Sequence, residues 1–135
     1  MVAETLNKTS TAVDQTYPVR SMTNTVTLTA STEDGDIYKM LNVKKGMRVV
    51  DVIFTSADVD QAALEVGIPA STNHSADPNL FITVADADGS AFRLDNATGA
   101  NFTFLDDTTI DVEIGTVTTP GTVAMELTLL YVQAY

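Results

Sequence analysis

The chain has 135 residues and no cysteine, so it can hold one domain with its own core but neither a disulfide nor a thiolate metal site. It carries 18 acidic and seven basic residues, a formal net charge of −11. A surface this acidic repels phosphate, which argues against nucleic-acid binding, and no run approaches the ~18 apolar residues of a membrane-spanning helix.

Residues 1–24 are predicted to form an extended arm. They are rich in threonine, serine and asparagine, and their two acidic and two basic residues cancel. Tyr17-Pro18 favours an extended backbone because proline restricts the residue before it. We expect the arm to contact a partner through Tyr17, Pro18 and Arg20. The domain proper, residues 25–135, then carries the whole net charge.

The stretch 35–55 is predicted to be the central hairpin of an all-β domain. Ile37, Leu41 and Val43 would share one face of its first strand, and a Lys-Lys-Gly turn follows, with a glycine that can adopt positive φ. The second strand, 47–55, is aliphatic on both faces, and its β-branched residues favour a buried strand.

Four of the five basic residues of the domain lie on this hairpin: Lys39, Lys44, Lys45 and Arg48. One interpretation is that these charges keep an exposed sheet edge from pairing with other chains. The other is a positive tip that docks on an acidic neighbour, such as another copy of this acidic chain. The first is favoured.

The middle of the chain offers one ambiguous segment and one predicted hairpin. Residues 56–67 match helical spacing and also end in a strand-like run; a loop followed by a short strand is favoured. Leu80–Ala85 is predicted to be a buried strand, Asp88-Gly89 a hairpin turn, and Ala91–Leu94 the returning strand.

The last third alternates with strand periodicity. Phe102 and Phe104 would share a face of a short strand 101–105, and residues 109–114 alternate apolar with acidic side chains. The final strand puts the odd-numbered residues 123–131 inward. Leu130 and Val132 then lie on its outer face, where we expect another subunit to cover them.

Eight or nine short strands without a convincing helix predict a β-sandwich, with the jelly roll as the topology that suits this number. The chain is thus read as one β-sandwich domain preceded by an arm.

No catalytic, metal or cofactor site is predicted. His74 has neither a second histidine nor a cysteine to complete a transition-metal site, so it is read as a surface-loop residue. Asp86 and Asp88 cover only a fragment of a calcium loop. Asp106-Asp107 are read as a turn, because adjacent strand residues point to opposite faces.

Several short motifs resemble one family. They are Asp36-Ile37 at the start of a strand, Lys45-Gly46 before the strand Val49–Phe54, Glu65-Val66-Gly67, and Leu130-Tyr131-Val132 in the last strand. Together they resemble the decoration, or cement, proteins of tailed-bacteriophage heads, over most of residues 30–132. The resemblance implies a jelly-roll homotrimer on the exterior of the capsid of a virion, in contact with the major capsid protein.

The sequence leaves other functions open. A carbohydrate-binding module shares the sandwich architecture, but it normally stacks sugars on exposed aromatic rings, and this chain has no tryptophan and four tyrosines. Another virion protein, at a spike or a fibre base, is a further alternative. An enzyme is the least favoured, because no nucleophile, base and orienting group can be assembled.

Overall fold

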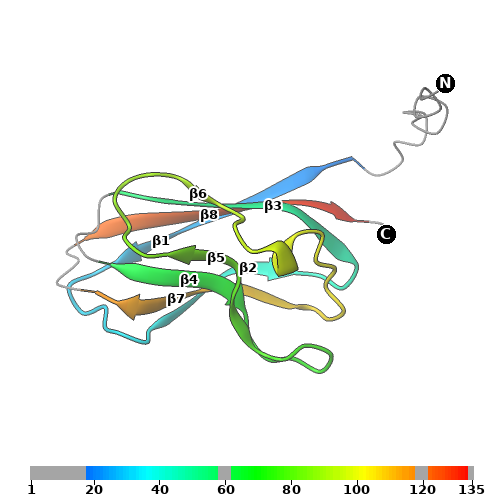
Figure 1. The fold of residues 1–135 in the computed structure, drawn as a ribbon, viewed down its shortest axis with the longest axis horizontal. Helices are drawn as coiled ribbons and strands as arrows, with labels where there is room; N and C mark the ends of the chain where they lie inside the picture. Colours follow the sequence, from blue (N-terminus) through cyan, green and yellow to red (C-terminus); the bar gives the residue numbers. More distant parts are fainter. Residues whose placement is uncertain (1–17, 58–61, 118–121, 134–135) are drawn as a thin grey trace, which may run out of the picture.

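The computed structural model describes residues 18–57, 62–117 and 122–133, and these form a two-layered β-sandwich (Figure 1). The strands are β1 (Arg20–Leu28), β2 (Ile37–Val43), β3 (Met47–Ser56), β4 (Ala63–Ile68), β5 (Asp77–Val84), β6 (Phe92–Arg93), β7 (Thr108–Thr116) and β8 (Val123–Gln133). One sheet has the order β1-β8-β3-β6 and the other β2-β7-β4-β5. A 3₁₀ turn, η1 (Ala97–Gly99), precedes β7.

This strand order is a jelly roll, as the sequence predicts. The first strand pairs with the last, β2 with β7, β3 with β6 and β4 with β5, all antiparallel, as in a chain doubled back on itself. Rolling that doubled chain adds the pairs β3–β8 and β4–β7, which complete the two sheets.

The core lies between the sheets and follows the alternation of the sequence. Ile110, Val112 and Ile114 of β7 are fully buried, and so are Met125, Leu127 and Leu129 of β8, which confirms both predicted faces. Phe54, Phe81 and Phe104 are the largest buried side chains. Each ring removed from water stabilises the fold by about 1.5–3 kcal/mol before entropy is counted.

The predicted central hairpin is wrong. β2 and β3 belong to different sheets, so the turn between them crosses the edge of the sandwich instead of joining paired strands. Gly46 does adopt positive φ, at 93°. A buried strand such as β3 needs partners on both edges, and residues far along the chain, β6 and β8, supply them.

Two β-bulges also change which side chains point inward. A register shift between Lys39 and Leu41 separates Ile37 from Leu41, so Ile37 is 55% exposed while Leu41 is buried. A second shift between Val49 and Asp51 leaves Val50 on the outside, 40% exposed. The inserted residue of a bulge reverses the alternation, and the sequence alone does not mark it.

Two further predicted elements differ from the structure. The segment after Asp88-Gly89 does not return alongside β5, because β6 pairs with β3 in the other sheet. Residues 101–105 form no regular strand; Phe102 and Phe104 instead exchange backbone hydrogen bonds with the start of β3, at 2.8 and 2.9 Å.

The N-terminal boundary of the domain lies earlier than the sequence suggests. β1 begins at Arg20 and pairs with β8 along its whole length, so residues 20–24 are part of the sandwich. Residues 1–17 lie outside the described part of the chain, and Tyr17 with them. In the ambiguous segment the favoured strand is confirmed as β4, and residues 58–61 are again outside the described part.

Candidate interaction surfaces

The four basic residues of the predicted tip do not form one patch. Lys39 contacts Asp111 at 3.3 Å on the outer face of the β2-β7-β4-β5 sheet. Lys44 lies 3.8 Å from Asp107 at the turn. In each of these two pairs a carboxylate offsets the lysine, although exposed pairs of this kind stabilise little.

The other two basic residues, Lys45 and Arg48, lie at the end of the sandwich where the chain turns from β2 into β3. The backbone N–H of Lys45 donates to Asp107 Oδ1 at 2.9 Å, while Arg48 donates through Nη1 to Asn101 Oδ1 at 3.0 Å. Among the described residues no carboxylate is paired with either side chain. A positive contact at this end would therefore use Lys45 and Arg48.

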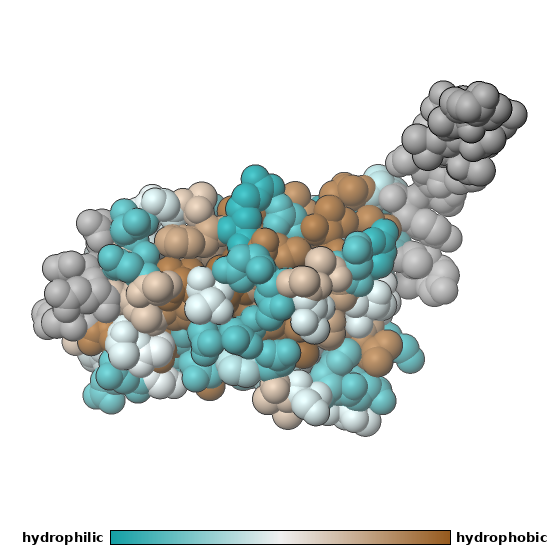
Figure 2. Space-filling view, in the orientation of Figure 1, coloured by the Kyte–Doolittle hydropathy of each residue, from teal (hydrophilic) through white to brown (hydrophobic). Residues whose placement is uncertain are grey.

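An apolar patch covers part of the outer face of the β1-β8-β3-β6 sheet. Leu130 and Val132, which the sequence places outward, are half-buried there. Val50 joins them because of the bulge in β3, and Val19, 58% exposed, directly precedes β1 at the level of Val132. Figure 2 shows apolar surface at the end of the molecule where β1 begins. We call Val19, Val50, Leu130 and Val132 the outer patch.

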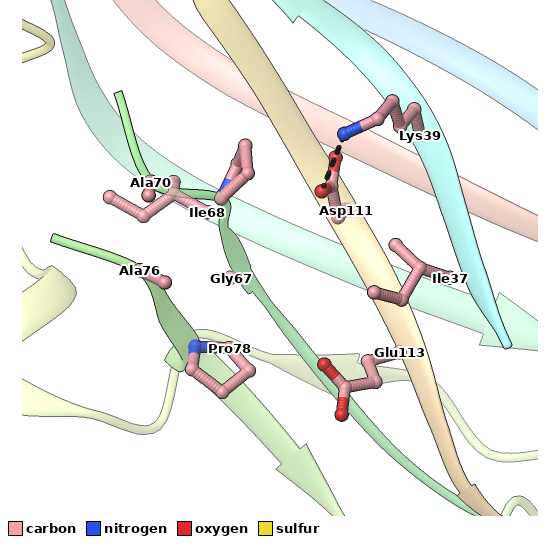
Figure 3. Close-up of a pocket in the computed structure, with 10 residues that line it drawn as sticks. Ile37, Lys39, Gly67, Ile68, Ala70, Ala76, Pro78, Asp111 and Glu113 are labelled. Carbon is pink, nitrogen blue, oxygen red and sulfur yellow. Dashed lines mark hydrogen bonds and ion pairs between the residues drawn. The ribbon is translucent and has the colours of Figure 1, made fainter. Parts of the chain in front are cut away.

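A groove of about 280 Å³ lies on the outer face of the opposite sheet (Figure 3). Its floor comes from β2, β4 and β7, and its wall from the loop 69–76 with the start of β5. Gly67 lets that wall come close: a Cβ there would lie 2.0 Å from the Asp77 carbonyl oxygen. Ile37, Ile68 and Pro78 make much of the lining apolar.

The floor of the groove also holds a buried carboxylate. Asp111 is 8% exposed and accepts hydrogen bonds from Lys39 Nζ at 3.3 Å and Thr109 Oγ1 at 2.6 Å. These contacts satisfy the charge, as a buried carboxylate requires. The sequence did not reveal this groove, because its residues come from four separate segments.

Asp106 fastens the wall of the groove to the loop 101–107. Its carboxylate accepts from Ser71 Oγ at 2.6 Å, from the Asn73 backbone N–H at 2.7 Å and from Asn73 Nδ2 at 2.7 Å. The hydrogen bond from Ser71, followed by that from the Asn73 backbone, lowers the pKa of Asp106 from its ordinary value of 3.8. Asp106 and Asp107 lie in bends of this loop, as expected for a turn.

His74 adds a second fastening to the same loop. Its Nε2 accepts from the Leu105 backbone N–H at 2.9 Å, and its ring lies 5.1 Å from that of Phe102. The side chain is half-buried and holds two loops together, whereas the sequence had suggested a free residue on a surface loop. A lone polar histidine gives no sequence signal for such a contact.

Of the two aspartates in the calcium-loop fragment, Asp88 has a local structural partner. Asp88 Oδ1 accepts from the Ser90 backbone N–H at 3.0 Å, and the hydrogen bonds from Ser90 lower the pKa of Asp88. Within the described part of the chain, no three metal-ligating side chains gather in one place. The same residues include no helix long and apolar enough to cross a membrane.

The fold occurs in known virus particles, although the sequence matches no protein-family model and no curated protein. A chain of the cyanophage Pam1 capsid asymmetric unit is similar, with a TM-score of 0.69 and 18% identity over 87% of this chain and 86% of that chain. Phage capsids contain this fold.

Two more capsids show the same similarity. A chain of the capsid of Ralstonia phage GP4 has a TM-score of 0.66 and 20% identity, covering 87% of this chain and 86% of that chain. A chain of the acidic stable capsid of Helicobacter pylori bacteriophage KHP30 has a TM-score of 0.62 and 14% identity, with coverages of 88% and 94%. Identities this low establish a shared fold.

Proposed function

We propose that this chain is a structural protein of a bacteriophage virion that decorates the exterior of the head. The observation that carries the proposal is the similarity to chains of three phage capsids. The similar region spans 86–94% of each of those capsid chains, so each chain is little longer than this domain. Chains of this size are what we expect of a small separate component that binds an existing shell.

The charge of the domain favours the outside of the shell. Packaged DNA would repel a body with a net charge of −11, whereas the exterior imposes no such cost. Decorating a head requires no catalysed reaction, and we propose that the chain is not an enzyme.

The outer patch supports self-association, and we propose a homotrimer. Apolar side chains that gather on one face are typical of a surface covered in an assembly. Leu130 and Val132 would lie at the centre of the contact, with Val50 and Val19 beside them. Symmetric closure then limits the assembly to a fixed number of copies.

The arm is proposed to fasten this coat to the head, where the major capsid protein is the partner. It could grip the shell itself or a neighbouring copy. Fully extended, residues 1–17 span roughly 55 Å at ~3.3 Å per residue, enough to reach either. Three arms on one trimer would act together and strengthen weak single contacts by ~10² or more.

Co-sedimentation with heads that lack the protein tests this role. The structure fixes where to truncate: a chain starting at Pro18 keeps all of β1, whereas a start at Thr25 would remove five paired residues. We expect the full chain to pellet with the heads and the chain from Pro18 to melt at nearly the same temperature but to pellet at least about tenfold less. Residues 1–17 carry only three charged side chains, Glu4, Lys8 and Asp14, so raised salt should leave much of the attachment intact.

A control chain with residues 1–17 replaced by a glycine-serine arm of equal length separates sequence from length. If the chain from Pro18 pellets as well as the full chain, the arm is not the fastening, and Lys45 and Arg48 become the better candidates. If the full chain itself does not pellet, the proposed decoration role is wrong.

A further inference from the structure

The one histidine of the chain makes a contact that requires its ring to be neutral. The Leu105 backbone N–H donates to Nε2 of His74 at 2.9 Å. A neutral imidazole has one bare nitrogen that can accept, whereas both nitrogens of an imidazolium carry a proton and can only donate. Uptake of a proton by His74 would therefore place two N–H groups against each other at this contact.

The other contacts of His74 do not require a neutral ring. The imidazole lies 5.1 Å from the ring of Phe102 and 6.4 Å from that of Phe104. The Ser71 backbone N–H donates to the His74 carbonyl oxygen at 2.9 Å, within the loop 69–76. The hydrogen bond from Leu105 is thus the contact that a change of charge breaks.

One carboxylate attracts the charged form of the ring. Hydrogen bonds from Ser71 and then from Asn73 lower the pKa of Asp106, and the positive charge of His74 lowers it further. Asp106 directly follows Leu105, so the ring has an alternative partner beside the one it would lose. The attraction of the imidazolium to Asp106 offsets the loss of the hydrogen bond from Leu105.

The other charged groups around the ring leave Asp106 as the main partner. Lys45 and Asp107 line the same hollow as Asp106, and their opposite charges offset each other. Arg48, at the start of β3, donates to Asn101 at 3.0 Å. The loop 69–76 contains no other titratable side chain, and the rings packed against the imidazole are apolar.

We propose that His74 is a pH-sensitive latch on the wall of the groove. Between about pH 8 and 5, where histidines change charge, the ring would release the Leu105 N–H and turn to Asp106. Asp106 already accepts from Ser71 and Asn73, so the charged ring competes with the residues that fasten the wall. The loop 69–76 loosens as a result, while the sandwich behind it stays folded. This inference concerns the free domain and does not depend on the decoration role.

Amide hydrogen exchange of the full-length chain, followed by NMR and corrected for the intrinsic effect of pH, tests the latch. We expect the protection of the Leu105 amide to fall at least about tenfold from about pH 7.5 to about pH 5.5. The Asn73 amide, which donates to Asp106, should lose protection with it. The Gly46 amide, which donates to the Phe104 carbonyl oxygen at 2.8 Å, should keep its protection.

The pH range isolates the histidine. Aspartate and glutamate usually titrate near about pH 4, and lysine and tyrosine near about pH 10. The nitrogen resonances of the His74 ring, recorded in the same samples, must therefore change over the same pH range as the protection of Leu105. If the two ranges differ, the latch is wrong.

Two variants separate the two partners of the ring. His74→Gln supplies an amide oxygen that can accept from Leu105 and does not titrate, so the protection of Leu105 should no longer fall with pH. Asp106→Asn removes the attraction for the charged ring. In that variant His74 should keep its contact with Leu105 down to a lower pH than in the natural chain.

Each contrary result overturns a stated part of the proposal. Constant protection of Leu105 in the natural chain would overturn the latch, and so would an equal fall in His74→Gln or at Gly46. A fall at Leu105 without one at Asn73 would overturn the loosening of the wall. An unchanged transition in Asp106→Asn would overturn Asp106 as the second partner.

Discussion

At the scale of single residues, a few polar side chains hold the loops that the sheets leave free. Asp106 is the main one, since it joins the loop 69–76 to the loop 101–107. The sequence offers only an Asp-Asp pair there, and its neighbours in space lie more than 30 positions away. Such contacts follow from the fold and are visible only once it is known.

The first prediction concerns the ionisation of Asp106. Its pKa is lowered in the folded chain, so the carboxylate stabilises the fold above pH ~3.8 and that contribution disappears as the pH falls through the folded pKa. We expect Asp106→Asn to lower the Tm at pH 7, and the difference from the natural chain to shrink below pH ~4. Thermal unfolding monitored by circular dichroism at several pH values measures both.

Asp86→Asn, outside this network, serves as the control and should leave the Tm nearly unchanged. Curves for Asp106→Asn and the natural chain that stay equally far apart from pH 7 to pH 3 would contradict the assigned hydrogen bonds.

At the scale of elements, close approach between strands shapes the groove. β5 begins against β4 at Gly67, where the backbone of Asp77 and Pro78 occupies the space of a side chain. Glycine is therefore required by contact at this position and not by its φ angle. The consequence is a groove wall that lies near the sheet.

The second prediction is that Gly67→Ala destabilises the domain. Its Cβ would lie 2.0 Å from the Asp77 carbonyl oxygen, and backbone atoms cannot move aside as a flexible side chain can. We expect a loss of about 1–3 kcal/mol in the free energy of unfolding, measured by urea denaturation.

Gly115→Ala is the matched control, since its Cβ would lie 3.5 Å from the Ala63 carbonyl oxygen, an ordinary contact. Equal stability of the two variants would show that the start of β5 does not lie this close to β4 at Gly67.

The sequence predicted elements where local pattern and environment agree. β7 alternates apolar with acidic residues from Ile110 to Ile114, and β8 has an apolar residue at every odd position from Val123 to Tyr131, so their inward residues were assigned correctly. The pairing of β2 with β7 and of β3 with β6 depends on contacts between distant residues, and the Asp88-Gly89 turn signal pointed to the wrong partner. The bulges at Met40 and Val50, which exposed Ile37 and Val50, have no periodic signature.

At the scale of the whole molecule, the two outer faces differ. One carries the outer patch, and the other carries the groove, whose lining includes Lys39, Asp111 and Glu113. Under the proposed function, the outer patch would form the contact that closes the trimer. The net charge of −11 would keep free copies apart until that contact forms.

The third prediction tests the outer patch. Light scattering at tens of micromolar should give the mass of a trimer for the natural chain and that of a monomer for Leu130→Lys, which puts a charge where an apolar contact of about 1.5–3 kcal/mol per copy is proposed.

Thr27→Lys makes the same charge change on the same face, six residues along β1 from the level of Leu130, and should leave the trimer intact. A monomeric natural chain, or an equal loss of mass in both variants, would contradict the patch as the contact.

Electron cryomicroscopy of native heads tests the central proposal most directly. If this chain decorates the exterior, the map will show jelly-roll density outside the shell into which the described residues fit, arranged as trimers. The density must be missing from heads made without the protein and must return when it is added. A map with the chain inside the shell, or with no difference between the two kinds of head, would contradict the account.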